Sequence, residues 1–171
     1  MEFNPLWYIH HGNRTDDLFA EGKHELVHDF IKRVHDELGI PAGVSCHNPD
    51  CIRYMEDHGW ETDLYQLCCY YITRPRDEIR AKLGGVMLCE SFIDTDRDTA
   101  LALVREVQKP FLVFKILGAG WHCESDESVE EAFKVVLSGI KKTDGIIVGM
   151  WPQFKDELTQ NLALLRKYGQ V

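Results

Sequence analysis

Five short and nearly uninterrupted apolar runs recur along this chain, and a segment with helical periodicity follows each of them. The runs cover residues 7–11, 42–47, 64–71, 111–117 and 146–150. Strands covered on both faces have this composition, whereas a sheet with one face in water would alternate apolar and polar residues. The alternation of strand and helix predicts a parallel sheet with right-handed crossovers.

The helical segments carry recognisable start and stop residues. Asn48 followed by Pro49 is an N-cap with proline at the first helical position. Gly39 suits the left-handed conformation that ends a helix. Ser128 and Glu131 have the spacing of a capping box. The stretch between the third and fourth runs is the longest, so we expect an insertion there.

Two features favour a barrel over a doubly wound sheet. The strand starts recur at roughly the 30-residue period of a (β/α)8 protein, and polar residues gather at the strand C-termini. No Gly-x-Gly-x-x-Gly follows the first run, which weakens a Rossmann interpretation. The chain has 171 residues, whereas a closed barrel usually takes roughly 250. We therefore predict an α/β fold, a single partial TIM barrel over residues 1–171 with five βα units.

Charge and cysteine content exclude several classes of protein. The formal net charge of -9 argues against nonspecific binding to nucleic acid or to an anionic membrane. No apolar stretch approaches the roughly 20 residues of a membrane span, and the N-terminus lacks signal-peptide regions. The six cysteines match neither a zinc pair nor a small disulfide scaffold. We expect a cytoplasmic protein with reduced thiols.

Short motifs at the strand ends carry a family resemblance. They are Trp-Tyr-Ile-His-His at 7–11, Gly-Val-Ser-Cys-His-Asn at 43–48, Asp-Leu-Tyr-Gln at 63–66 and Phe-Lys-Ile-Leu-Gly at 114–118, followed by Gly149 and the pair Gln160-Asn161. In this order they resemble strands four to eight of the aldo/keto reductase superfamily, over nearly the whole chain. The runs at 10–16, 114–120 and 147–150 look like a divergent branch related to the reductases, whose activity is not established.

The resemblance implies binding of NADP or NAD and reduction of a small-molecule carbonyl substrate. His10 matches the histidine that lies beside the substrate carbonyl in the family. Ser45 matches one partner of the nicotinamide carboxamide, Cys46 stands in place of the family's asparagine, and Gln66 matches a third partner. Phe114 would stack on the nicotinamide ring.

The fourth run adds a second candidate for catalysis. Lys115 replaces the family's serine inside an apolar segment, where desolvation would lower its pKa and favour a reactive neutral amine. The resemblance also implies further cofactor-binding positions, with glutamine in place of a glutamate at position 160. These positions are Leu117, Gly118, Gly149, Gln160 and Asn161.

The family's chemistry also needs an aspartate, a tyrosine acid and a lysine from its first three βα units, all of which would lie before Met1. Hydride transfer requires a proton donor within about 3 Å of the developing alkoxide, and His10 alone is a poor substitute. We therefore expect little or no reductase activity from this chain by itself.

Two alternatives remain open at the level of sequence. His10 and His47 end neighbouring strands and would suit a metal-dependent barrel hydrolase or isomerase, although no metal site belongs to the principal interpretation. The other alternative is a non-catalytic half-barrel. Its open sheet edges would favour a homodimer.

Overall fold

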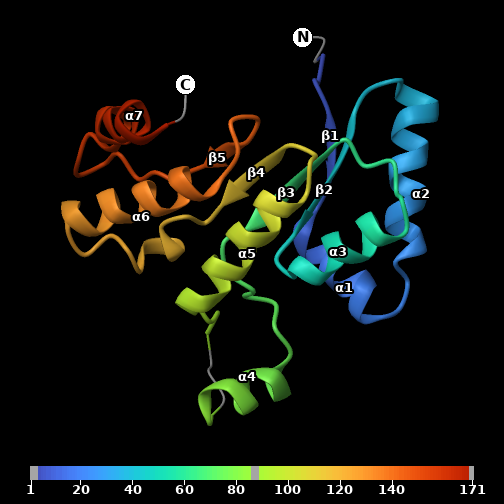
Figure 1. The fold of residues 1–171 in the computed structure, drawn as a ribbon, viewed down its shortest axis with the longest axis horizontal. Coiled ribbons are helices and arrows are strands. Elements are labelled where there is room, and N and C mark those ends of the chain that lie inside the picture. The colour runs from blue at the N-terminus through green and yellow to red at the C-terminus, as the bar shows by residue number, and fades with distance from the viewer. Residues whose placement is uncertain (1–3, 86–88, 170–171) are drawn as a thin grey trace.

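The computed structural model describes residues 4–85 and 89–169. Five strands form one all-parallel sheet, as the apolar runs predict (Figure 1). Each strand is shorter than its run, because residues at the run ends, such as His47 and Lys115, belong to the loops. The strands are β1 Tyr8–His10, β2 Ala42–Cys46, β3 Leu64–Cys68, β4 Phe111–Phe114 and β5 Gly145–Ile147.

The strand order is sequential, β1-β2-β3-β4-β5. Right-handed crossovers that always step in the same direction keep their helices on one side of a sheet. A doubly wound sheet instead reverses its order at a switch point. This chain is thus wound in a single direction, as successive βα units of a barrel are. Within the described residues, β1 and β5 each pair with one neighbour and form the two edges.

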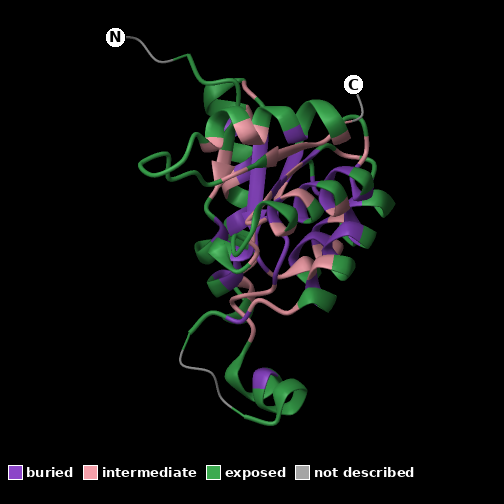
Figure 2. Ribbon diagram, turned by 90° about the vertical axis from the view of Figure 1, so that its left-hand side faces the viewer, coloured by how far each residue is buried: buried purple, intermediate pink, exposed green. Residues whose placement is uncertain are grey.

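The two faces of the sheet are covered unequally. Val44, Tyr65 and Val113 share the face on which the side chains of the three central strands, β2 to β4, are fully buried. Gln66 and Leu112, which are neighbours on the opposite face, are only half-buried. Figure 2 shows the buried strands at the centre of the molecule. We call the first the helix face and the second the open face.

Helices fill the connections between the strands. They are α1 Gly12–Ala20, α2 Glu25–Arg33, a π-helix at Val34–Leu38, α3 Pro49–Asp57, α4 Arg76–Leu83, α5 Asp94–Glu106, a 3-10 turn at Gly118–Gly120, α6 Asp126–Gly139 and α7 Glu157–Tyr168. The β3–β4 connection holds both α4 and α5, which confirms the predicted insertion. In Figures 1 and 2, α4 stands apart below the other elements. Among the described residues, no helix combines the length and apolar character needed to cross a membrane.

The capping predictions are confirmed at two helices and wrong at a third. The Asn48 side chain accepts a hydrogen bond from the Asp50 N–H at 3.0 Å, and Gly39 ends its helix with φ of 65°. At α6, however, the cap is Ser125, which accepts from the Ser128 N–H at 3.2 Å. Two serines three residues apart can both be placed at a helix start, and the helix begins at the earlier one.

Candidate functional site

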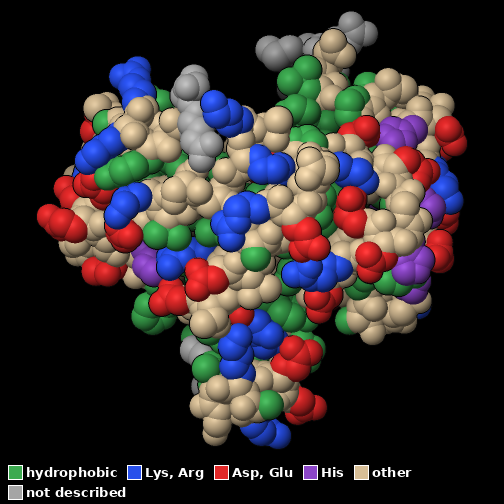
Figure 3. All heavy atoms as spheres, in the orientation of Figure 1, with side chains coloured by type: hydrophobic (Ala, Val, Ile, Leu, Met, Phe, Trp, Pro, Cys, Tyr) green, Lys and Arg blue, Asp and Glu red, His purple; other side chains and the backbone are tan. Residues whose placement is uncertain are grey.

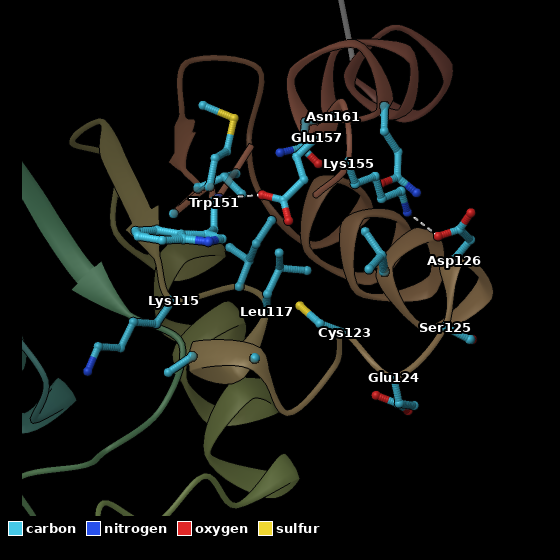
Figure 4. Close-up of a pocket in the computed structure, with 18 residues that line it drawn as sticks. Lys115, Leu117, Cys123, Glu124, Ser125, Asp126, Trp151, Lys155, Glu157 and Asn161 are labelled. Atoms are coloured by element: carbon cyan, nitrogen blue, oxygen red, sulfur yellow. Dashed lines mark hydrogen bonds and ion pairs between the residues drawn. The ribbon is translucent and has the colours of Figure 1, made fainter. Parts of the chain in front are cut away.

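A cavity of about 540 Å³ lies where the loops after β4 and β5 meet the starts of α6 and α7 (Figure 4). These loops leave the C-terminal ends of two neighbouring parallel strands, which is where sites form in folds of this kind. The volume is in the range of small-molecule sites. The residues that line the cavity include Lys115, Leu117, Cys123, Asp126, Gly149, Trp151, Lys155, Glu157, Gln160 and Asn161.

The loop after β4 has an unusual backbone. Lys115 and Ala119 adopt left-handed conformations with φ of 58° and 51°, as do the glycines at 118 and 120. A left-handed non-glycine residue costs of order 1–3 kcal/mol and persists mainly where the surrounding structure requires it. The N–H groups of Gly118 and Gly120 donate to the carbonyls of Lys115 and Leu117. This hydrogen-bonded turn forms one wall of the cavity.

Charged side chains on the cavity wall pair with one another. Lys155 forms an ion pair with Asp126 across the opening, as Figure 4 shows, and this hydrogen bond to Lys155 lowers the pKa of the Asp126 carboxyl. The Glu157 carboxylate accepts a hydrogen bond from the Trp151 N–H at 2.5 Å. Among the described residues, Lys115 is the one other lysine on the wall.

Several predicted positions come together in this cavity. Leu117, Gly149, Gln160 and Asn161 all line it, although they come from the loop after β4, the loop after β5 and helix α7. A Cβ atom built on Gly149 would meet nothing within 4 Å, so the cavity is open at that point. Gly118 lies in the loop after β4 and is buried.

Lys115 lies at the edge of the cavity, and its amine points away from it (Figure 4). Its Nζ atom lies 3.0 Å from Glu90 and 5.7 Å from the centre of the Phe92 ring. The amine is thus held in an ion pair outside the cavity. This placement does not support imine chemistry.

The predicted partners of the nicotinamide carboxamide lie on the open face of the sheet. Ser45 and Gln66 are register partners in β2 and β3. Phe114 shares this face, because Gln66 pairs with Leu112 and strand side chains alternate. The open face thus brings together Ser45, Gln66 and Phe114 at the C-terminal half of the sheet.

Cys46 and His10 do not share the open face with these residues. Cys46 follows Ser45 and therefore points to the helix face, where it is 0% exposed and burial raises its pKa well above the usual value. The His10 Nδ1 atom lies 2.8 Å from Thr15 Oγ1 in α1, and its ring contacts the edge of Phe30 in α2. The structure therefore does not bring the side chains of His10 and Ser45 to the same face of the sheet.

A buried polar network at the end of β2 was not predicted in full. Asp16, in α1, lies 31 residues from His47 and accepts hydrogen bonds from its N–H and from its Nδ1–H, the latter at 2.8 Å. It also accepts from the Asn48 N–H at 3.2 Å and from Thr73 Oγ1 at 2.9 Å. Both Asp16 and His47 are buried.

The metal alternative gains no support from this geometry. His47 lies on the open face with Ser45, whereas His10 faces the helices. Within residues 4–85 and 89–169, no group of three or more His, Cys, Asp or Glu side chains is arranged to hold a metal ion. The two histidines that the hypothesis requires are on opposite faces of the sheet.

Comparisons of this chain with protein-family models, with curated proteins and with solved structures find no match. The site is therefore interpreted from its geometry and chemistry.

Proposed function

We propose that this chain binds a nicotinamide dinucleotide, NADP or NAD, as the cofactor-binding part of a carbonyl reductase of the aldo/keto reductase type. One observation carries the proposal. Leu117, Gly149, Gln160 and Asn161 are separated in sequence, and they line a single cavity. The resemblance assigns these four positions to the cofactor independently of their placement in space.

The open face supplies a site for the other end of such a molecule. Ser45 and Gln66 are adjacent hydrogen-bonding side chains, which suit a carboxamide that both donates and accepts. Phe114 offers a half-buried aromatic ring on the same face. A ligand extended from these residues to the cavity would follow the C-terminal ends of β2 to β5, where ligands bind in parallel α/β folds.

The charged side chains around the cavity fit the phosphates of a dinucleotide only in part. Lys155 lines the cavity, and its ion pair with Asp126 would have to open for it to meet a phosphate. Over the face shown in Figure 3, positive and negative side chains are interspersed. Affinity would therefore depend on hydrogen bonds and stacking more than on a basic patch.

Tryptophan fluorescence tests the proposal directly, because Trp151 lines the cavity. Titration with NADPH is expected to quench the emission, and Trp151→Phe is expected to remove most of the change. Trp121→Phe is the matched control, since Trp121 is also exposed and does not line this cavity. A flat titration up to millimolar NADPH and NADH would reject dinucleotide binding and favour the non-catalytic half-barrel.

A second pair of variants tests the location of the site. Asn161→Ala is expected to weaken NADPH binding about tenfold, the effect of losing roughly one hydrogen bond. Gln153→Ala changes an exposed residue of the β5–α7 loop outside the cavity wall and is expected to have no effect. Equal dissociation constants for the two variants would place the ligand elsewhere.

A further inference from the structure

The Asp16–His47 pair is a buried polar group that the proposed function does not use. A carboxylate can only accept hydrogen bonds, so the 2.8 Å contact places the proton on His47 Nδ1. In neutral His47 the Nε2 atom then carries the lone pair. Among the described residues, Nε2 has no hydrogen-bond partner, whereas Asp16 accepts from four residues, His47, Asn48, Cys51 and Thr73. Asp16 therefore fixes one tautomer and one orientation of the ring.

The position of His47 connects this pair with the proposed cofactor site. A Cβ atom built on Gly12 would lie 3.0 Å from Ser45 Oγ and 3.1 Å from His47 Cε1, so both side chains meet the same turn of α1. The His47 ring also contacts the edge of Phe114, with 5.4 Å between ring centres. His47 is thus adjacent to two of the residues assigned to the nicotinamide end.

We propose that His47 is the proton donor for reduction of a carbonyl substrate and the proton acceptor in the reverse direction, with Asp16 as its positioning residue. This inference rests on the proposed dinucleotide binding and supplies the acid that the resemblance places outside this chain. A bound reduced nicotinamide would supply the hydride for the carbonyl carbon. His47, in its cationic form with both ring nitrogens protonated, gives the Nε2 proton to the carbonyl oxygen, and the neutral ring that remains, protonated at Nδ1, takes up a new proton from solvent.

The role of Asp16 follows from the same geometry. As Nε2 gains a proton, the ring becomes a cation, and the buried carboxylate at 2.8 Å stabilises it. A positioned acid and base of this kind contributes typically 10²- to 10⁴-fold to a rate. A purely structural pair would join α1 to β2 equally well, but it would not respond to a ligand on the open face.

Imidazole nitrogen NMR separates the two roles without any substrate. Spectra of the wild-type chain are expected to show His47 protonated at Nδ1, with its Nε2 signal shifting when NADP⁺ is added. His35 provides an internal control, because its Nε2 lies 2.7 Å from Asp63 in a comparable pair at the protein surface. Asp16→Asn is expected to change the His47 tautomer. An unmoved His47 signal at an NADP⁺ concentration that saturates the fluorescence change would overturn the proposal.

Turnover provides the second measurement. With NADPH and 4-nitrobenzaldehyde, His47→Gln is expected to lower kcat by about 100-fold or more and to leave the dissociation constant of NADPH unchanged. His35→Gln is expected to match the wild type. Equal rates for wild type and His47→Gln, including no rate in either, would overturn the role of His47. A flat Trp151 titration would instead reject dinucleotide binding and this inference together, so the two failures are distinguishable.

Discussion

Replacing Asp16 by alanine is the most direct test of the network at the end of β2. The variant removes a buried carboxylate that accepts from the N–H and Nδ1–H of His47, the N–H of Asn48 and the hydroxyl of Thr73. The two donors of His47 are buried, so they lose a partner without gaining water. Asn48 and Thr73 are partly exposed and can be solvated instead.

The expected cost follows from these donors. Each buried donor left without a partner costs about 1–3 kcal/mol, and breaking a buried charged network costs about 3–5 kcal/mol. We therefore expect Asp16→Ala to lower the free energy of unfolding by about 3–5 kcal/mol. A domain is typically stable by about 5–15 kcal/mol, so the loss is a large fraction of the total.

Urea unfolding followed by circular dichroism measures this loss. Asp17→Ala is the matched control, because Asp17 is the next residue of the same helix and is exposed. Its expected effect is within about 0.5 kcal/mol. Asp16→Asn keeps the size of the side chain and one acceptor, so its loss is expected to be intermediate. A loss below about 1 kcal/mol for Asp16→Ala would refute the argument, because one unsatisfied buried donor alone should exceed it.

Three further predictions concern other parts of the fold. Gly12→Ala is expected to destabilise the protein by about 1–3 kcal/mol through overpacking, measured by urea unfolding, whereas Gly85→Ala should be neutral because its Cβ would meet nothing within 4 Å. Burial, and then two neighbouring basic residues, lower the pKa of His10 below 6.5; its contribution to stability is therefore present above pH 6.5 and is lost as the pH falls through the lowered folded-state pKa. His10→Gln should flatten that pH dependence, and an unchanged slope would contradict the shift. Ile147 at the β5 edge and Leu162 on α7 are 40% and 43% exposed, so we expect concentration-dependent self-association in sedimentation that Ile147→Lys reduces; a monodisperse wild-type monomer would exclude it.

The sheet was predictable because its strands carry a strong local signal. A strand that is buried on its helix face and half-buried on its open face has a nearly continuous apolar sequence. Each of the five apolar runs contains a strand of the sheet. The length of an apolar run did not predict the length of its strand. The third run continued to residue 71, but β3 ends at Cys68, because Cys69 and Tyr70 are buried in the connection that follows and not in the sheet.

The sequence does not predict helix α1, because the buried side of this helix is largely polar. Its buried residues include Thr15 and Asp16, which satisfy groups at the ends of β1 and β2. A search for apolar periodicity does not detect such a helix. The partner of Asp16 is equally invisible in sequence, since His47 lies 31 residues away and only the parallel pairing of β1 with β2 brings them together.

The alternation of side chains along a strand restricts which of the predicted site residues can face one ligand. Ser45 and Cys46 are consecutive in one strand, so only one of them can face a ligand on the open face. His10 pairs with Val44 in the register of β1 and β2, and Val44 belongs to the helix face. A motif match gives positions along the chain, whereas the alternation of side chains decides which residues can meet.

The sequential strand order explains why the candidate groups lie where they do. Winding in one direction places the helices on one side and leaves the other side of the sheet half-buried, as at Gln66 and Leu112. All five strands also end at the same edge of the sheet. This edge carries the network of Asp16, after β1, with His47, after β2. It also carries the cavity after β4 and β5, so both groups lie along one rim of the sheet. A ligand that lies along this rim can contact both the cavity and the open face. A site at the opposite edge would be built from the loops that precede the strands. None of the residues that line the cavity after β4 and β5 comes from those loops.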